Sequence, residues 1–110
     1  MDGMNRGNVY WVRFDPAEGG EIKKVRPAII VSNNISNRIL NRVQVVPVTS
    51  NTKKVYPGES LFSLNQKNGK ALCSQIRTVS KARLGKYIGD LSEADMFNLE
   101  HALKIQLGFI

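Results

Sequence analysis

The sequence is poor in the residue types that build disulfides and metal sites. It has one cysteine, Cys73, and one histidine, His101. A single cysteine excludes an internal disulfide, and the two residues together are too few for a zinc set of cysteine and histidine ligands. No acidic metal-binding constellation and no glycine-rich phosphate loop occurs either. We therefore expect no metal site and no cofactor, and we interpret Cys73 as a small buried residue within a strand.

Long apolar runs are also missing. No segment approaches the roughly 18 consecutive apolar residues that span a bilayer, and residues 1–10 lack the basic and then apolar pattern of a signal peptide. A chain of 110 residues can build one modest core. We expect a single cytoplasmic domain over residues 1–110.

Acidic side chains are scarce in the middle of the chain. Between Ile22 and Gly89 there are thirteen lysines and arginines but only one acid, Glu59, and the formal net charge of the whole chain is +7. A basic middle favours a polyanionic partner, which can be nucleic acid or an acidic protein segment.

The patterns that are present are those of short β-strands. Residues 8–14 are rich in β-branched and aromatic side chains, which predicts a first strand. Residues 23–32 join a cluster of cations to an uninterrupted apolar run, which predicts a strand buried on both faces. We place Pro27 at its first position, so that Arg26 lies where a loop enters the sheet. The glycine-containing residues 17–22 before it predict a mobile loop that could act as a lid.

The middle of the chain predicts a third strand and a hairpin. Residues 42–49 have strand character, and Pro47 indicates a sheet edge or a bulge. Residues 60–65 are expected to pair with residues 70–79 across a turn at Asn68-Gly69.

Shorter elements fill the gaps between these strands. We expect a turn and a short helix over 33–41, a basic loop over 53–59, a single helical turn over 80–85 and a last strand over 86–91. The sheet then has five or six strands.

A helix is predicted at the C-terminal end. Ser92 and Asp95 form the pattern of a capping box, and Gly108 is suited to end the helix. One helical stripe carries Met96, Leu99, Leu103 and Leu107. His101 lies off this stripe, so we expect it in solvent or at a subunit contact, and Ile105, also off the stripe, suggests a dimer contact.

These elements predict a mainly β protein with a C-terminal α-helix. Short antiparallel strands usually avoid unpaired edges by closing, so we expect a small curled sheet or barrel.

Several separate motifs, in order, resemble those of the MazF/PemK family of toxin endoribonucleases, over Arg6 to Leu107. The motifs are Arg6-Gly-Asn-Val-Tyr-Trp-Val, Lys24-Val-Arg-Pro-Ala, Val46-Pro-Val-Thr-Ser-Asn, Cys73-Ser-Gln-Ile-Arg-Thr and Ala82-Arg-Leu-Gly-Lys.

The resemblance implies an SH3-like β-barrel that forms a homodimer and acts as the toxin of a type II toxin-antitoxin system. Such a toxin cuts single-stranded RNA at short sequences, and an acidic C-terminal segment of a MazE-like antitoxin covers its RNA groove. By position, Arg26 and Thr49 would be catalytic. We assign RNA binding to six further residues: Lys23, Lys24, Ser50, Asn51, Gln75 and Arg77. Ser74 departs from the family pattern, which often has an acid before the glutamine.

The chemistry needs no metal, because the ribose 2′-hydroxyl of RNA can attack the adjacent phosphate and leave a 2′,3′-cyclic phosphate and a 5′-hydroxyl. Arg26 would stabilise the charge of the phosphorane and Thr49 would bond a non-bridging oxygen. The general base stays unassigned. Two alternatives are a toxin of the same fold that binds DNA gyrase without cutting RNA, and an inactive RNA-binding barrel.

Overall fold

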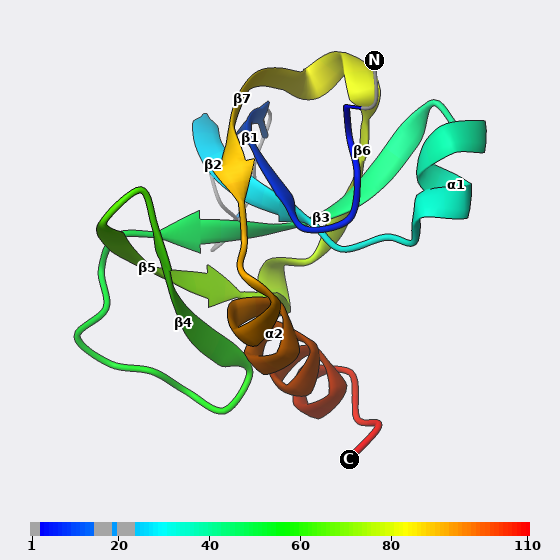
Figure 1. The fold of residues 1–110 in the computed structure, drawn as a ribbon. Coiled ribbons are helices and arrows are strands. Elements are labelled where there is room, and N and C mark those ends of the chain that lie inside the picture. Colours follow the sequence, from blue (N-terminus) through cyan, green and yellow to red (C-terminus); the bar gives the residue numbers. More distant parts are fainter. Residues whose placement is uncertain (1–2, 15–18, 20–23) are drawn as a thin grey trace.

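The fold is a curled antiparallel sheet with a C-terminal helix packed against it (Figure 1). The computed structural model describes residues 3–14, 19 and 24–110. Lys23 therefore lies outside the described residues, and so does the expected lid over residues 17–22 except for Gly19. The elements in chain order are β1 Asn8–Arg13, β2 Val25–Ile30, α1 Asn34–Ile39, β3 Arg42–Thr49, β4 Glu59–Leu64, β5 Lys67–Leu72, the 3₁₀ turn η1 Cys73–Gln75, β6 Arg77–Ser80, the 3₁₀ turn η2 Lys81–Arg83, β7 Leu84–Asp90 and α2 Glu93–Gln106. The predicted mainly β class with a C-terminal helix is confirmed.

The sheet has seven strands within the described residues, rather than five or six. Its order is β4-β5-β3-β2-β1-β7, and β6 pairs with β3 beside this path. The strand expected over residues 70–79 is in fact divided by η1 into β5 and β6. Both parts pair with the same edge of β3: β6 with its first half and β5 with its last two residues. Cys73 is buried as expected, but it lies in η1 rather than in a strand.

Pro47 does not mark a sheet edge. On one side it is the Cα partner of Ala28 in β2, so β3 is a central strand. On the other side Pro47 lies between Val45, the last residue that pairs with β6, and Val48, the first that pairs with β5. A residue without a backbone donor is tolerated at this change of partner strand.

The hairpin turn lies at Asn65 and Gln66, not at Asn68-Gly69. Both residues have positive φ, 52° and 66°, as a two-residue type I′ turn requires. Gly69 is instead within β5, opposite Phe62, and a Cβ on Gly69 would lie 2.6 Å from the Phe62 ring. The glycine is therefore needed for packing rather than for the turn.

β2 begins two residues earlier than predicted. Pro27 is its third residue, and it pairs with Trp11 of β1. Only the second half of β2, Ala28–Ile30, is fully buried, because this half pairs with β3 and its first two residues pair with β1 as well. The exposed first half, which contains Arg26, has β1 as its partner.

Two apolar clusters lie on opposite faces of the central strands. The first gathers Val9, Ile29, Val46, Val48, Phe62, Ala71, Cys73, Leu91, Leu99 and Ala102 under α2 and the β4–β5 hairpin. The second gathers Tyr10, Val12, Phe14, Ala28, Ile30, Val43, Val45 and Val79. Neighbouring residues of one strand enter different clusters, because side chains alternate between the faces of a strand.

α2 begins and ends as its sequence predicts. The Ser92 hydroxyl accepts a hydrogen bond from the Asp95 amide at 3.1 Å, but the Asp95 carboxylate accepts from the Ser63 amide of β4 at 3.2 Å. Gly108, with φ 79°, and Phe109 donate to the Ile105 and Lys104 carbonyls, which closes a Schellman motif.

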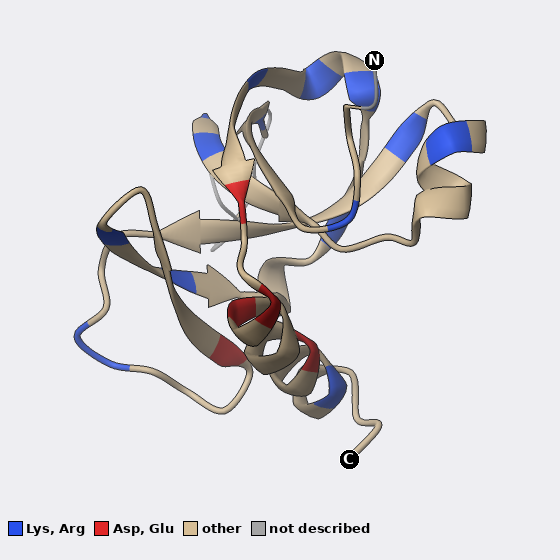
Figure 2. Ribbon diagram, in the orientation of Figure 1, with Lys and Arg blue, Asp and Glu red and all other residues tan. Residues whose placement is uncertain are grey.

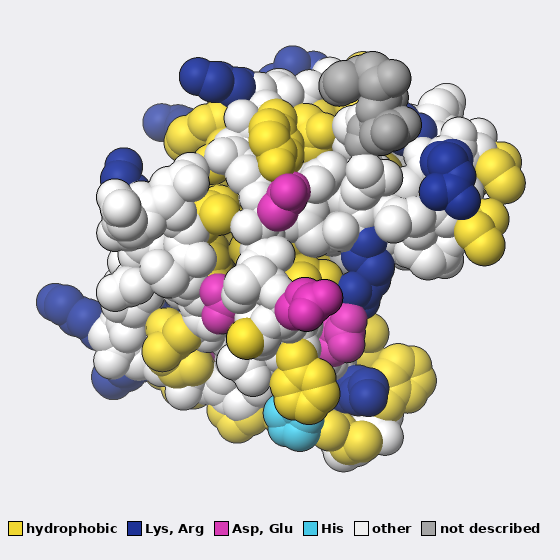
Figure 3. Space-filling model, in the orientation of Figure 1, with side chains coloured by type: hydrophobic (Ala, Val, Ile, Leu, Met, Phe, Trp, Pro, Cys, Tyr) yellow, Lys and Arg dark blue, Asp and Glu magenta, His cyan; other side chains and the backbone are white. Residues whose placement is uncertain are grey.

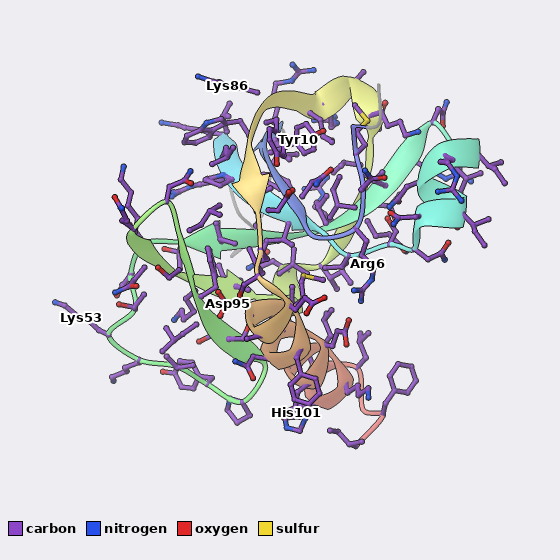
Figure 4. All side chains as sticks on the ribbon, in the orientation of Figure 1. Arg6, Tyr10, Lys53, Lys86, Asp95 and His101 are labelled. Atoms are coloured by element: carbon purple, nitrogen blue, oxygen red, sulfur yellow. The ribbon has the colours of Figure 1, made fainter. Side chains whose placement is uncertain are left out.

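Part of the predicted helix stripe is wrong. Leu107 is the C-cap residue of α2 and is 51 % exposed, whereas Ala102 is buried. Ile105 is partly buried, and His101 is exposed and points away from the helix into solvent (Figure 4). Within the described residues, neither helix has the length and apolar character needed to cross a membrane.

Candidate active site

A pocket of about 430 Å³ opens where the first apolar cluster reaches the surface. One wall comes from the central strands and the other from the β4–β5 hairpin and β7. Its lining consists of Val9, Trp11, Val25, Arg26, Pro27, Val48, Thr49, Ser50, Phe62, Leu64, Asn65, Lys67, Asn68, Gly69 and Ile88. The two residues predicted to be catalytic, Arg26 and Thr49, are therefore brought to one pocket from separate strands.

Arg26 reaches the pocket from the exposed end of β2. The strand starts after Lys24, whose φ of 61° is left-handed and whose carbonyl accepts a hydrogen bond from the Phe14 amide at 2.7 Å. Arg26 is exposed and pairs with Val12 of β1 through the backbone. Among the described residues none forms an ion pair or hydrogen bond with its guanidinium. A cation so placed is available to an anionic ligand.

Thr49 is the last residue of β3, and its hydroxyl is oriented by the loop that follows. The Asn51 amide donates to Thr49 Oγ1 at 3.2 Å. Because the oxygen accepts this bond, its own hydrogen remains able to donate to a ligand in the pocket. Ser50, the next residue, also lines the pocket.

A buried ion pair holds the loop after Thr49. Lys70, the Cα partner of Thr49 in β5, lies 3.0 Å from Glu59 Oε1 and donates to the Lys54 carbonyl at 2.6 Å. The same Glu59 oxygen accepts from the Tyr56 amide at 3.0 Å. The only acid of the basic middle region thus accepts a hydrogen bond from one end of the Tyr56–Glu59 turn and pairs with Lys70 at the other.

Cys73 lies close to this ion pair but has no reactive character. It is fully buried, and burial together with the charge of Glu59 raises the pKa of the Cys73 thiol to about 11. A thiol that stays protonated at neutral pH is a poor nucleophile.

Gln75 and Arg77 lie apart from the pocket lining. Gln75 ends η1, and Arg77 begins β6 as the Cα partner of Val45. The Arg77 guanidinium lies 5.5 Å from the centre of the Phe14 ring, which is buried in the second cluster. Arg77 thus forms a cation–π contact with a core residue.

Two other predicted RNA-binding residues also lie outside the pocket lining. Lys24 precedes β2, and Asn51 uses its carboxamide oxygen to accept from the Lys53 amide at 3.3 Å. Of the six residues assigned to RNA binding, Ser50 alone lines the pocket among those that the structure describes.

Several lining residues were missed by the sequence analysis. Trp11 is 42 % exposed, and it lies on the same strand face as Val9, so the alternation along β1 could have indicated it. Lys67 and Asn68 were missed because the hairpin turn was predicted at the wrong place.

The charges are divided between different parts of the surface. Among the described residues, acids lie on α2, at the end of β7 and, as Glu59, at the start of β4, while most lysines and arginines are spread over the other strands and loops (Figure 2). On the face in Figure 3, acidic side chains lie in the middle and most basic ones around the periphery, while Arg6 lies beside the acids and forms an ion pair with Glu100. Lys53 and Lys86 point outward from the fold (Figure 4). Within the described residues, no group of three or more His, Cys, Asp or Glu could hold a metal ion.

Known proteins are similar to this chain in sequence or in fold over nearly their whole length. Endoribonuclease MazF9 of Mycobacterium tuberculosis is 42 % identical over 113 residues, which is 94 % of this chain and 96 % of that protein. Endoribonuclease MazF of Staphylococcus epidermidis is 33 % identical over 96 % of this chain and 92 % of its own.

Solved structures agree with these sequence relatives. A mycobacterial endoribonuclease in complex with its cognate antitoxin superposes with a TM-score of 0.83, at 28 % identity and 98 % coverage of both chains. MazF of Deinococcus radiodurans also gives a TM-score of 0.83, at 25 % identity and 96 % coverage of both chains. The family model of PemK-like, MazF-like toxins of type II toxin-antitoxin systems matches residues 5–107, and the chain belongs to this family.

Proposed function

We propose that the protein is the endoribonuclease toxin of a type II toxin-antitoxin system and cuts single-stranded RNA at short sequences. The observation that carries the proposal is the meeting of Arg26 and Thr49 in one pocket of a chain that belongs to the PemK/MazF toxins. The relatives quoted above are named endoribonucleases, which favours cleavage over docking to DNA gyrase. Cutting messenger RNA in the cytoplasm would inhibit translation and growth.

The reaction we propose uses the RNA's own nucleophile. The 2′-hydroxyl gives up its proton as its oxygen bonds to the adjacent phosphorus, the bond from phosphorus to the 5′-oxygen breaks, and the departing oxygen takes up a proton, so that protons balance. Arg26 stabilises the added negative charge of the phosphorane, and the Thr49 hydroxyl donates to a non-bridging oxygen. The geometry of Thr49 supports this role, because its oxygen is already held by the Asn51 amide.

The partners follow from the same family membership. We propose that an acidic segment of a MazE-like antitoxin covers the pocket and its basic surroundings, and that it competes with RNA for Arg26. Attraction between the acidic segment and this basic surface would speed association and weaken with salt. We also propose a homodimer, to which the exposed Phe97 of α2, 70 % accessible, offers an apolar contact.

The test is cleavage of single-stranded RNA by the purified chain in the presence of EDTA. We expect products with a 2′,3′-cyclic phosphate and a 5′-hydroxyl. The 5′-hydroxyl is detected by direct labelling with polynucleotide kinase, without prior phosphatase treatment. Products that end in a 5′-phosphate, or activity that EDTA abolishes, would contradict this mechanism.

A further inference from the structure

The amide that bonds the Thr49 hydroxyl belongs to the loop between β3 and β4, residues 50–58 (Figure 1). Among the described residues, the backbone of residues 51–55 makes no hydrogen bond to another backbone group. A surface loop without backbone pairing would sample several conformations. Side chains must therefore hold the Asn51 amide against Thr49.

Two consecutive side-chain turns hold the start of this loop. Thr49 Oγ1 accepts a hydrogen bond from the Asn51 amide at 3.2 Å, and Asn51 Oδ1 accepts one from the Lys53 amide at 3.3 Å. Each side-chain oxygen bonds the backbone two residues further on, which is the pattern of an ST-turn followed by an Asx-turn. The Asn51 side chain thus fixes its own backbone, and the amide of that backbone orients the Thr49 hydroxyl.

Asn51 itself lies outside the pocket. The two residues before it, Thr49 and Ser50, belong to the pocket lining, but Asn51 does not. Its carboxamide oxygen already accepts a hydrogen bond from the Lys53 amide. This arrangement fits a residue that acts through its neighbour better than one that touches RNA.

The buried ion pair anchors the far side of the two turns. Both turn bonds are at the long end of the range for N–H···O bonds, so each is weak alone. Directly after them, the Lys54 carbonyl accepts a hydrogen bond from Lys70 Nζ at 2.6 Å, and Lys70 is the Cα partner of Thr49. The path of contacts therefore leaves Thr49 and returns to the residue opposite it. Closing this short loop removes conformational freedom that the turn bonds alone would have to overcome.

We propose that Asn51 is a positioning residue for Thr49 rather than an RNA contact. The inference rests on the proposed function, in which the Thr49 hydroxyl donates to the phosphorane. Because Oγ1 accepts from the Asn51 amide, the hydroxyl hydrogen is directed elsewhere and is available to the ligand. A donor that is oriented before RNA binds needs no reorganisation in the transition state. Loss of the Asn51 side chain should therefore lower the cleavage rate and leave RNA affinity unchanged.

Three substitutions at Asn51 separate positioning from RNA contact. Asn51→Ala removes the turn acceptor, Asn51→Asp keeps an oxygen in the same place, and Asn51→Gln keeps the carboxamide but moves it out of the turn. The full-length variants cleave a short single-stranded RNA that contains one site cut by the wild-type protein, and kcat and KM are measured separately. We expect Asn51→Ala and Asn51→Gln to lower kcat about tenfold with unchanged KM, because the donor is misplaced rather than lost. Asn51→Asp should retain kcat, although its charge raises KM.

The Thr49→Ala background tests whether Asn51 acts through Thr49. Adding Asn51→Ala to Thr49→Ala should lower kcat by less than about twofold, because the hydroxyl to be positioned is already absent. Thr52→Ala is the matched control, since Thr52 follows Asn51 in the same loop, lies outside the pocket lining and takes no part in the two turn bonds. It should leave kcat and KM unchanged, and circular dichroism checks that each variant is folded.

Amide hydrogen exchange gives a readout that needs no activity. In the ¹⁵N-labelled chain, the amides of residues 51 and 53 should lose protection in Asn51→Ala. Both amides should stay protected in Asn51→Asp and in Thr52→Ala, because these variants keep the acceptor at position 51.

Several outcomes would overturn the positioning role. An unchanged kcat in Asn51→Ala would remove Asn51 from the reaction, and a raised KM in Asn51→Ala that Asn51→Gln restores would make it an RNA contact. A further tenfold loss in the Thr49→Ala background, as for two independent groups, would show that Asn51 does not act through Thr49. If the wild-type chain does not cut RNA, the proposed function fails, whereas unchanged amide protection in Asn51→Ala refutes the positioning role whatever the activity.

Discussion

Arg26 and Lys70 are two cations beside Thr49 with opposite surroundings. Arg26 lines the pocket together with Thr49 from an exposed strand end, and among the described residues none binds its guanidinium. Lys70 is 8 % exposed and is held by Glu59 and the Lys54 carbonyl. A basic region thus contains cations that are free to bind a ligand and cations that stabilise the fold. Sequence position does not distinguish them, but burial and partners do.

The substitution of Arg26 should have the largest effect on the cleavage rate, and it tests whether the two cations differ in role. We expect Arg26→Ala to lower the cleavage rate by about 1000-fold or more, the upper range for loss of a group that stabilises developing charge. The melting temperature should stay unchanged, since an exposed cation contributes little to stability. Arg42→Ala is the control, because Arg42 is also an exposed strand arginine but lies outside this pocket. A large fall in melting temperature would show that Arg26 is structural.

Lys70 should show the reverse behaviour. We expect Lys70→Met to lower the free energy of unfolding by about 3 kcal/mol, because it leaves the nearly buried Glu59 carboxylate without its cation. Urea denaturation measures the change, and Lys53→Met, at an exposed lysine of the loop, should leave stability unaltered. The double variant Lys70→Met/Glu59→Leu should recover part of the loss. A double variant whose loss equals the sum of the two single losses would mean that the pair does not interact.

Thr49 is the Cα partner of Lys70 and lines the pocket with Arg26. Substitution of Thr49 tests whether its hydroxyl acts in the reaction. We expect Thr49→Ala to slow cleavage by ~100-fold, as for loss of one donor to a developing oxyanion. Thr49→Ser keeps the hydroxyl and should retain most of the rate. Thr78→Ala, at an exposed threonine of β6, is the control. If the serine variant is as slow as the alanine variant, the hydroxyl is not the reason for the loss.

The smallest effect is expected at Arg77, whose guanidinium packs over Phe14. We expect Arg77→Ala to lower the free energy of unfolding by about 1 kcal/mol through loss of the cation–π contact. Its effect on RNA affinity should be about tenfold or less, with an unchanged rate at saturating RNA. A loss of rate equal to that of Arg26→Ala would place Arg77 in the reaction and break the distinction between ligand-binding and structural cations.

Much of the fold could be predicted because the signals are local. The strand Arg42–Thr49 and the cap of α2 at Ser92 follow from β-branched runs and a capping side chain, and both were found where the sequence predicts them. The hairpin turn was misplaced, since Asn68-Gly69 is a stronger turn signal than Asn65-Gln66. Packing of the Phe62 ring against Gly69 explains why that glycine belongs to the strand instead.

The sequence by itself determined the β class, the terminal helix, the basic middle and the family motifs that point to Arg26 and Thr49, because each of these depends on residues close together in the chain. Only the tertiary structure decided which side chains share the pocket. Trp11, Phe62 and Lys67 meet there through pairing of distant strands, a relation that no local pattern encodes. The tertiary structure also decided that Lys70 is buried and that Arg77 packs on Phe14, because burial depends on what the rest of the fold places around a residue.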